Sequence, residues 1–457
     1  MRYHKALVIA ILGLMLAAFC AWAFLKPDAT AAGILFAALS AALFALAAVR
    51  CVGPTLETLS AEPEGPQKAP ALSRESRRLH PWFRILLFAL LSRIAVLALA
   101  YAFDLAAYGY QGGLFERLYG ILVRTDAPHY LGIAENWYVT VGDPRFHIVF
   151  FPLFPIAVRG MMFLIPDAFA ASLAVSTVSY MAASILLYEL ALLDFGRKGA
   201  WRAVILLALL PAGFFFCAPM SESLFLMLSL GCLLLARKGR FVLAGACGAL
   251  AAFTRSPGLL LIIPVTFEAA RSIVVLQKSG ASGRALWGRA FGRGGASLLI
   301  ALGFLGYLYV NYAVTGNPFQ FMIYQSEHWS QRLGLFFSTF GNQAEYALKA
   351  LASGDMPELL GLWLPNLVSQ LAALTVLLLS AKKLRPGYTL YALAYFAFTM
   401  GATWLLSAPR YLAGLCVIQL ALAALARGKS LFAALAVVFC AAGVCYLYAF
   451  VAGYPVY

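Results

Sequence analysis

Charge is scarce in this chain of 457 residues. Asp, Glu, Lys and Arg together make up 12% of it, whereas hydrophobic residues make up 63%. A soluble domain carries about 25% charged residues, and a soluble protein of this length could not keep so apolar a surface in water. The composition excludes a soluble enzyme and a disordered chain. The apolar runs are continuous rather than alternating, which also excludes a transmembrane β-barrel. A helical protein that crosses a membrane several times remains.

Sequence motifs for metals, disulfide frameworks and nucleotides are missing as well. The eight cysteines form no CxxC pair, and most lie inside apolar runs, where cysteine behaves as a small hydrophobic residue. No Walker motif, GxGxxG, HExxH or GxSxG occurs in a suitable context. The sequence therefore indicates neither a zinc site nor a disulfide framework.

Acidic residues are fewer than basic residues. The chain has 19 Asp and Glu and 34 Lys and Arg, which gives a net charge of +15. The basic residues gather in short segments between apolar runs, such as Arg197–Arg202, Arg237–Arg240, Lys382–Arg385 and Arg427–Lys429. That distribution is typical of cytoplasmic loops and not of a nucleic-acid-binding surface. We expect no nucleic-acid partner, a cytoplasmic amino terminus and contacts with membrane lipids.

The apolar runs predict an all-α polytopic membrane protein with about thirteen transmembrane helices, because a spanning helix needs about 20 apolar residues. Phe150–Ile165 is apolar but short, and it contains two prolines and Arg159. Counting it as a span would place the basic loops outside, so we expect a helix lying in the outer interface. The expected spans are 6–25, 31–50, 84–104, 168–193, 201–217, 220–236, 241–254, 257–275, 295–313, 358–380, 387–405, 409–426 and 430–451.

One segment has the composition of a linker. Residues 53–80 are rich in Pro, Glu and Ser and end in a basic stretch, as expected for a cytoplasmic tether that contacts lipid headgroups. This linker divides the chain into an amino-terminal transmembrane hairpin, residues 1–52, and a transmembrane body, residues 81–457. Two long outer loops, 105–167 and 314–357, are where we expect function to reside, because the other connections are short.

The first outer loop holds the densest group of chemically active residues, Arg124-Thr-Asp-Ala-Pro-His-Tyr130. We expect a short amphipathic helix here, with Asp126 and His129 three residues apart and therefore on one face. Asp126 could cap that helix or act as a general base at the membrane surface. Most of the other acidic residues also fall on the outer side, which places any acid–base chemistry outside the cytoplasm.

Further polar residues lie at the expected outer ends of spans. Glu222 opens one helix, where a negative charge is favourable in any case. Arg255 interrupts two short apolar stretches, and Arg410 begins another span. Each arginine could extend its charge to the headgroups, or the two could clamp a phosphate together. The second long loop adds the segment Glu327-His328-Trp329.

Five short segments occur in order along the expected outer face: Asp126-Ala-Pro-His129-Tyr130-Leu-Gly-Ile-Ala134, Phe150-Phe-Pro-Leu-Phe-Pro155, Pro219-Met-Ser221-Glu222-Ser223, Thr254-Arg255-Ser256-Pro257-Gly258 and Pro409-Arg410-Tyr411. Together they resemble the GPI mannosyltransferase II (PIG-V-like) family of GT-C glycosyltransferases, in a prokaryotic form. The similarity runs from about residue 82 to 425. Thr125, Phe154 and Met220 depart from the family pattern at lining positions, so they bear on the acceptor more than on the reaction.

The resemblance implies a GT-C-type fold, with interfacial helices in its long first outer loop. It also implies an inverting transfer of a sugar, mannose being the expected one, from a polyprenyl-phosphate donor to a hydroxyl of a lipid- or glycan-linked acceptor. Asp126 would be the catalytic base, and the donor phosphate would be held by Arg255, Arg410 and His129. A lipid phosphate leaves without a nucleotide and the chain has no DxD, so we expect no metal and no cofactor. The remaining substrate contacts would come from Glu222, Tyr130, Glu327, His328, Trp329 and Tyr411.

Three other interpretations stay open. A lipid or oligosaccharide transporter, such as a flippase, would need polar residues spread through its spans. Here the charges gather at the outer ends, with Arg93 and Glu189 as the main exceptions. A GT-C enzyme for a different sugar and a non-catalytic membrane scaffold are the other two. The expected location is the plasma membrane, with the active site on the extracytoplasmic face.

Overall fold

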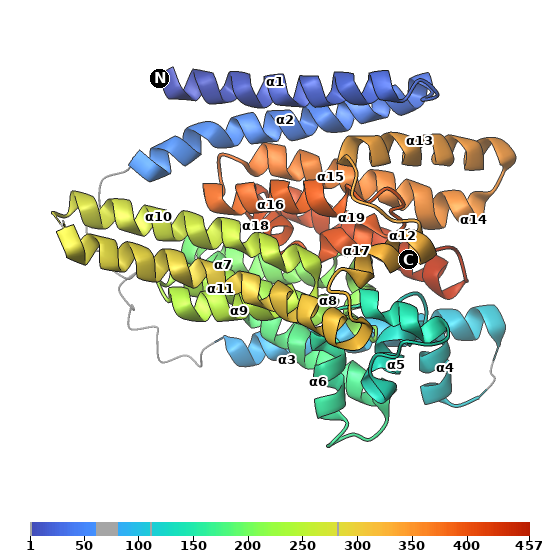
Figure 1. Cartoon of the computed structure of the whole chain (residues 1–457). Coiled ribbons are helices and arrows are strands. Elements are labelled where there is room, and N and C mark those ends of the chain that lie inside the picture. The colour runs from blue at the N-terminus through green and yellow to red at the C-terminus, as the bar shows by residue number, and fades with distance from the viewer. Residues whose placement is uncertain (1, 61–80, 110–111, 281–282) are drawn as a thin grey trace.

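The computed structural model describes residues 2–60, 81–109, 112–280 and 283–457, and in these residues the regular structure is helical (Figure 1). The one β-type contact is an isolated bridge between Leu333 and Ala402. The expected all-α architecture is confirmed. The helices are α1 Arg2–Leu25, α2 Ala31–Ser60, α3 Trp82–Tyr108, α4 Leu114–Leu122, α5 Ala127–Asn136, η2 Asp143–Val149, α6 Leu153–Met161, α7 Ala168–Ala208, η3 Pro211–Cys217, α8 Glu222–Arg237, α9 Phe241–Thr254, η4 Ser256–Leu261, α10 Ile262–Lys278, α11 Gly283–Thr315, α12 Gln320–Trp329, α13 Phe336–Ser353, α14 Met356–Glu358, η5 Leu359–Trp363, α15 Leu364–Ser380, α16 Pro386–Thr399, α17 Ala408–Ala413, α18 Val417–Leu425 and α19 Lys429–Val451.

Within the described residues, eight helices are long and apolar enough to cross a membrane, or nine if the bent pair η3 and α8 forms one span. This makes the chain a multi-span membrane protein. The expected number of about thirteen is not confirmed, because several expected spans form shorter helices. Of these, α9 and α16 have 14 residues each, and α17 and α18 have 6 and 9.

The longest helix, α7, is two helices joined at a kink. Gly196 has φ 66° and ψ −178° within it, a left-handed backbone region that glycine enters without the steric cost of a Cβ. The kink falls between two expected spans, 168–193 and 201–217. The expected span 201–217 is not confirmed, because α7 ends at Ala208 and Pro211–Cys217 form the separate helix η3.

Breaks in the helices position the polar residues inside the bundle. η3 and α8 meet at an angle of 101°, which brings the start of α8 into the interior. Non-helical backbone at membrane depth must find its hydrogen-bond partners within the protein. Arg93 of α3 is 2% exposed and donates to the carbonyls of Gly213 (2.6 Å) and Ala208 (3.1 Å). Arg93, a charge away from the outer ends of the expected spans, therefore satisfies backbone carbonyls where α7 ends and η3 begins.

The short helices lie at one end of the long ones. Figure 1 places α4, α5, α6 and α12 together at the right of the bundle, where residues 105–167 and 314–357 come together. α6 has nine residues and rises only about 14 Å, less than the roughly 30 Å of a bilayer core. The interpretation of Phe150–Ile165 as a helix that does not span is confirmed.

The amino-terminal hairpin, α1 and α2, packs along α13 at the edge of the bundle (Figure 1). Trp22 lies edge-on to Phe337 at 5.7 Å and donates to Ser338 Oγ at 2.8 Å. α2 continues to Ser60, past the expected boundary at residue 52. The rest of the expected linker, 61–80, lies outside the described residues. The division into hairpin, linker and body remains a prediction.

Candidate active site

Four charged side chains from separate segments form a chain of ion pairs, here called the charged cluster: Arg255, Glu222, Arg410 and Asp126. Arg255, at the break between α9 and η4, pairs with the carboxylate of Glu222, the first residue of α8. Arg410 Nε of α17 lies 3.6 Å from Glu222 Oε1, and its Nη2 lies 2.7 Å from Asp126 Oδ2 at the start of α5. The sequence had placed all four at the same level, and the structure joins them.

Burial divides the charged cluster. The side chains of Glu222, Arg410 and Arg255 are 2%, 4% and 11% exposed, whereas that of Asp126 is 28% exposed. Two guanidinium groups balance two carboxylates, which is what buried charges require, because an unpaired buried ion is costly. Asp126 is therefore the member of the charged cluster that is most open to solvent.

Asp126 does not cap its helix. It occupies the position before α5, but its side chain makes no capping hydrogen bond and turns to Arg410 instead. The preceding residue, Thr125, has φ 55°, a left-handed conformation that is unusual and strained for a β-branched residue. The capping interpretation is wrong, and the strained turn at Thr125 aims the carboxylate into the charged cluster.

Hydroxyl and aromatic groups line the charged cluster. Ser221 Oγ accepts from Arg255 Nη1 at 3.2 Å and lies 3.0 Å from the Tyr130 hydroxyl. Burial raises the pKa of Tyr130 well above its usual value, so this hydroxyl stays protonated. The ring of Tyr411 lies beside both arginines, 5.0 Å from Arg255 and 5.7 Å from Arg410. The Tyr395 hydroxyl donates to the carbonyl of Tyr411 at 2.9 Å, and this hydrogen bond holds α17 in place beside the charged cluster.

Three histidines meet beside the charged cluster in a group of rings, here called the histidine group: His129, His147, His328, Trp329, Phe146 and Phe150. His129 stacks on Phe150 and lies edge-on to His147, both at 4.8 Å. His328 stacks on Phe146 at 4.2 Å, and Trp329 lies 5.8 Å from Phe150. Among the described residues, no three His, Cys, Asp or Glu side chains are arranged to hold a metal ion.

The two inner histidines are uncharged near neutral pH. Burial and, to a smaller extent, the neighbouring His129 lower the pKa of His147 to about 4. Burial also lowers the pKa of His129, against the opposing charge of Asp126. Because α5 carries both Asp126 and His129, the histidine group adjoins the exposed edge of the charged cluster. It can offer neutral donors, acceptors and ring faces there.

The structure brings together most of the residues selected from the sequence. Asp126, Glu222, Arg255 and Arg410 form the charged cluster, with Tyr130 and Tyr411 against it, and His129, His328 and Trp329 belong to the histidine group. Glu327 is the exception, since it is exposed on α12 and forms no ion pair with the described residues.

Two residues of the site were missed, Ser221 and His147. The chain has five histidines, and three lie in the two long outer loops. Two of these were selected, so taking all three would have found His147. Ser221 stood within a quoted segment, but only the bend before α8 shows that its hydroxyl faces Arg255.

Part of the sequence, less than half of its length, matches a known family. Residues 76–275 match the family model described as Mannosyltransferase (PIG-V). The predicted resemblance to the PIG-V family is confirmed. The matched stretch contains Asp126, Glu222 and Arg255. Arg410 lies beyond it, and the structure is what brings this residue to the other three.

The curated relatives match this PIG-V-like chain over short stretches. GPI alpha-1,6-mannosyltransferase 2 of Cricetulus griseus is 32% identical over 160 residues, 33% of this chain and 32% of the relative. The human protein of that name is 30% identical over 169 residues, 35% and 34% of the two chains. GPI mannosyltransferase 2 of Yarrowia lipolytica is 38% identical over 109 residues, 23% and 30%. The chain thus matches about a third of the length of these relatives.

Among solved structures, ArnT from Cupriavidus metallidurans bound to undecaprenyl phosphate is 17% identical with a TM-score of 0.42, covering 74% of this chain and 60% of that one. The oligosaccharyltransferase AglB from Archaeoglobus fulgidus, in complex with an inhibitory peptide and a dolichol-phosphate, is 13% identical with a TM-score of 0.34. That similarity covers 78% of this chain and 55% of the other.

Proposed function

We propose that this chain is an inverting glycosyltransferase that moves mannose from a polyprenyl-phosphate donor to a hydroxyl of a lipid- or glycan-linked acceptor. The observation that carries the proposal is the Asp126–Arg410 pair, 2.7 Å long, at the exposed edge of an otherwise buried cluster. In this pair, the carboxylate of Asp126, which a substrate could reach, lies beside a guanidinium group that could bind a phosphate. The family match and the names of the relatives, which are mannosyltransferases, support the choice of reaction.

The proposed step is a single displacement. Asp126 takes the proton of the acceptor hydroxyl while the acceptor oxygen attacks the anomeric carbon. The bond from that carbon to the phosphate oxygen breaks, and its electron pair leaves with the lipid phosphate. Inversion requires the base and the leaving group on opposite sides of the anomeric carbon. Among the residues proposed to bind the phosphate, Arg255 lies farthest from Asp126 along the chain of ion pairs.

The arginines stabilise the charge that develops on the leaving phosphate. Each guanidinium carries five N–H donors in a fixed fork, so phosphate oxygens can bind Arg255 and Arg410 while the carboxylates keep theirs. We assign His129 to the same phosphate. Glu222 and the hydroxyl of Tyr130 would bind sugar hydroxyls, together with Tyr411, His328, Trp329 and Glu327.

We further propose that the protein lies in the plasma membrane with its amino terminus in the cytoplasm and the charged cluster on the extracytoplasmic side. The basic segments between spans support this orientation. Labelling of single cysteines from outside intact cells tests it. A cysteine at Asp143, the exposed first residue of η2, should be labelled, and one at Lys238, directly after α8, should be protected.

Transfer of radiolabelled mannose tests the reaction. The purified protein receives polyprenyl-phosphate mannose and a lipid extract of its host, and Asp126→Asn is compared with Asp143→Asn. Asp143 is an exposed carboxylate in the same loop, so its variant is the matched control. We expect Asp126→Asn to reduce transfer by about 10²-fold or more, as for loss of a general base, with the control unchanged.

Each other result is informative. Equal transfer by both variants would remove Asp126 from the chemistry and direct attention to Glu222 and Glu327. Absence of transfer in all proteins, with the donor still bound, would contradict this donor–acceptor pair and favour a transporter.

A further inference from the structure

A cavity of about 450 Å³ lies where α13, α14, η5 and the segment before α17 meet. Aromatic rings and carboxylates line it, and it is here called the aromatic pocket. Figure 1 places α14 at the end of the bundle that also holds α5 and α12, so the pocket lies at the same end of the molecule as the candidate active site. The lining residues that carry the argument are Tyr346, Asp355, Glu358, Trp363, Trp404 and Leu406.

The aromatic rings pack on one another and form a platform. Trp363 is 3% exposed and stacks on Tyr346, with ring centroids 4.9 Å apart and planes inclined by 16°. Trp404 stands perpendicular to Tyr346 at 5.7 Å, and these two residues are 38% and 37% exposed. An ammonium group is recognised by rings that surround it, whereas stacked rings leave no space between them. The rings therefore suit a flat, apolar face of a ligand.

Two carboxylates stand beside the rings, and each uses one oxygen within the protein. Glu358 Oε1 accepts from Trp363 Nε1 at 2.9 Å, and Asp355 Oδ1 accepts from the backbone N–H of Glu358 at 3.0 Å. Neither carboxylate forms an ion pair within the part of the chain that the structure describes. The second oxygen of each carboxylate is thus left to accept a hydrogen bond from a ligand.

This combination of groups indicates a sugar. Tryptophan and tyrosine gather at the headgroup level of any membrane protein, which accounts for the rings but not for the carboxylates, since anionic headgroups repel them. A sugar ring has hydroxyl groups that donate to carboxylates and a C–H face that covers an aromatic ring. Pockets for small ligands combine aromatic walls with a few placed polar groups in the same way.

The aromatic pocket is connected to both parts of the candidate active site. The carbonyl of Trp404 accepts from Gln331 Nε2 at 2.7 Å, and Gln331 follows Trp329 of the histidine group by two residues. In the other direction along the chain, Leu406 precedes Arg410 by four residues, so their backbones lie at most about 14 Å apart. One substrate can therefore occupy the aromatic pocket and reach the charged cluster.

We infer that the aromatic pocket binds a sugar unit of the acceptor, away from the hydroxyl that reacts. Trp404 stacks on this sugar, and Asp355 and Glu358 accept hydrogen bonds from its hydroxyl groups. The acceptor is then a lipid that already carries a saccharide. The inference rests on the proposed transfer reaction, because it names the acceptor of that reaction.

Kinetics of the full-length protein with polyprenyl-phosphate mannose and the lipid extract of its host test the inference. Trp404→Ala removes the exposed ring, and Asp355→Asn removes an exposed carboxylate while keeping its shape. The matched controls are Trp287→Ala and Asp143→Asn, which change an exposed tryptophan and an exposed aspartate that do not line the pocket. The apparent KM for the extract and for the donor, and kcat, are measured for each protein.

We expect Trp404→Ala to raise the apparent KM for the extract by about tenfold, as for loss of an aromatic anchor. The KM for the donor and kcat should stay unchanged, because the contact is made equally before and during the reaction. Asp355→Asn should raise the same KM less, and it serves if Trp404→Ala does not fold. Trp404→Phe, which keeps a ring, should recover part of the loss.

The labelled product gives a second result. Released from its lipid, the transferred mannose should be part of a saccharide of at least two sugars, and mannose as the sole sugar would overturn the inference. An unchanged KM in both pocket variants, or equal changes in the controls, would overturn it while the proposed reaction stands. Absence of transfer by the wild type would overturn the proposed reaction, and the inference with it.

Discussion

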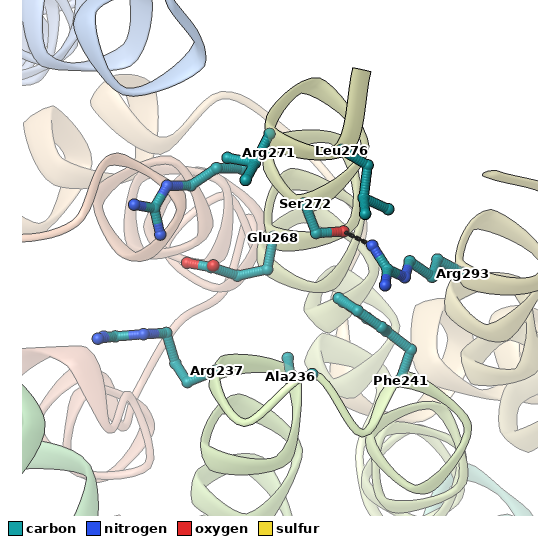
Figure 2. Close-up of a pocket in the computed structure, with 10 residues that line it drawn as sticks. Ala236, Arg237, Phe241, Glu268, Arg271, Ser272, Leu276 and Arg293 are labelled. Atoms are coloured by element: carbon teal, nitrogen blue, oxygen red, sulfur yellow. Dashed lines mark hydrogen bonds between the residues drawn. The ribbon is translucent and has the colours of Figure 1, made fainter. Parts of the chain in front are cut away.

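α8 and α9 join two groups of arginines that differ in burial. In the charged cluster two arginines meet two carboxylates, and three of the four side chains are at most 11% exposed. The second group surrounds a cavity at the other end of these helices, lined by Arg237, Glu268, Arg271 and Arg293 and called the basic pocket in this comparison (Figure 2). There Arg237 pairs with Asp194 and Arg385 lies beside Glu268, and these four side chains are 10% to 20% exposed. Buried charges must be paired in place, whereas pairs closer to solvent are screened more strongly.

This difference bears on function. A balanced, buried cluster has fixed dipoles and little freedom to rearrange, which suits stabilisation of charge in a transition state. The predictions below test the contrast between the two regions, beginning with the largest expected effect.

Removing one charge from the charged cluster should be strongly destabilising. Glu222→Gln leaves two buried guanidinium groups opposite Asp126 alone, and we expect a loss of about 3–5 kcal/mol in the free energy of unfolding. Denaturant unfolding of the purified protein measures it. Glu135→Gln, an exposed carboxylate of the same outer region, is the control. A loss below about 1 kcal/mol, as for a surface ion pair, would show that the cluster is solvated.

The corresponding change at the basic pocket should cost less. Asp194→Asn weakens the paired hydrogen bonds to Arg237, but the two side chains are 20% and 10% exposed, and the Tyr388 hydroxyl still accepts from Arg237 at 2.9 Å. We expect a loss of about 1.5–3 kcal/mol, typical of hydrogen bonds to charged groups. The same unfolding experiment measures it. A cost equal to that of Glu222→Gln would remove the distinction in burial.

Salt should affect one region and spare the other. Raising the salt concentration from about 0.05 to 0.5 M should reduce the stability lost in Asp194→Asn, because charges near solvent are screened. The stability lost in Glu222→Gln should change little, since buried pairs are screened much less. Unfolding curves at both salt concentrations give the two numbers. Equal salt dependence of the two losses would mean that the regions do not differ in screening.

Mild acid should act on the side of the charged cluster, because the histidine group lies there and no histidine lines the basic pocket. The folded pKa of His147, about 4, is below its ordinary value of 6.5. The unfolded chain therefore binds more protons between these pH values, and stability falls as the pH drops from about 6.5 towards 4.

His147→Gln should reduce that loss. We expect the difference in Tm between pH 6.5 and pH 5 to shrink by about 1–3 °C relative to wild type. His4→Gln, on exposed α1, should leave it unchanged. An unaltered pH dependence in His147→Gln would show that His147 is hydrated and titrates normally.

The sequence predicted the kind of fold better than its details. Composition and apolar runs alone predicted a polytopic helical protein, because so apolar a protein surface is unfavourable in water and favourable in a bilayer. The expected number of spans is not confirmed, because an apolar run of 14 residues such as Phe241–Thr254 has the same composition whether its helix crosses the membrane or lies inside the protein. The basic residues from Arg197 to Arg202 indicated an interruption near the kink at Gly196, but not that one helix would continue through it.

For the candidate site, too, the sequence predicted the residues better than their arrangement. Residue types and order selected Asp126, Glu222, Arg255 and Arg410 and placed them on one face, because a membrane protein keeps its charges at helix ends unless function requires otherwise. The sequence did not show that Arg410 pairs with Asp126. These residues are 284 positions apart (410 − 126), and no local sequence pattern links them.

The sequence by itself therefore determined that this protein lies in a membrane and which chemically active side chains it carries. Hydrophobicity and charge are properties of single residues and add up along the chain. What only the tertiary structure decided is which charges neutralise each other and which are left over. Whether an arginine joins the buried ion-pair chain of Glu222 or the more exposed pairs of Glu268 and Asp194 depends on distances of a few ångströms between distant segments, because ion pairs and their desolvation vary steeply with separation and burial.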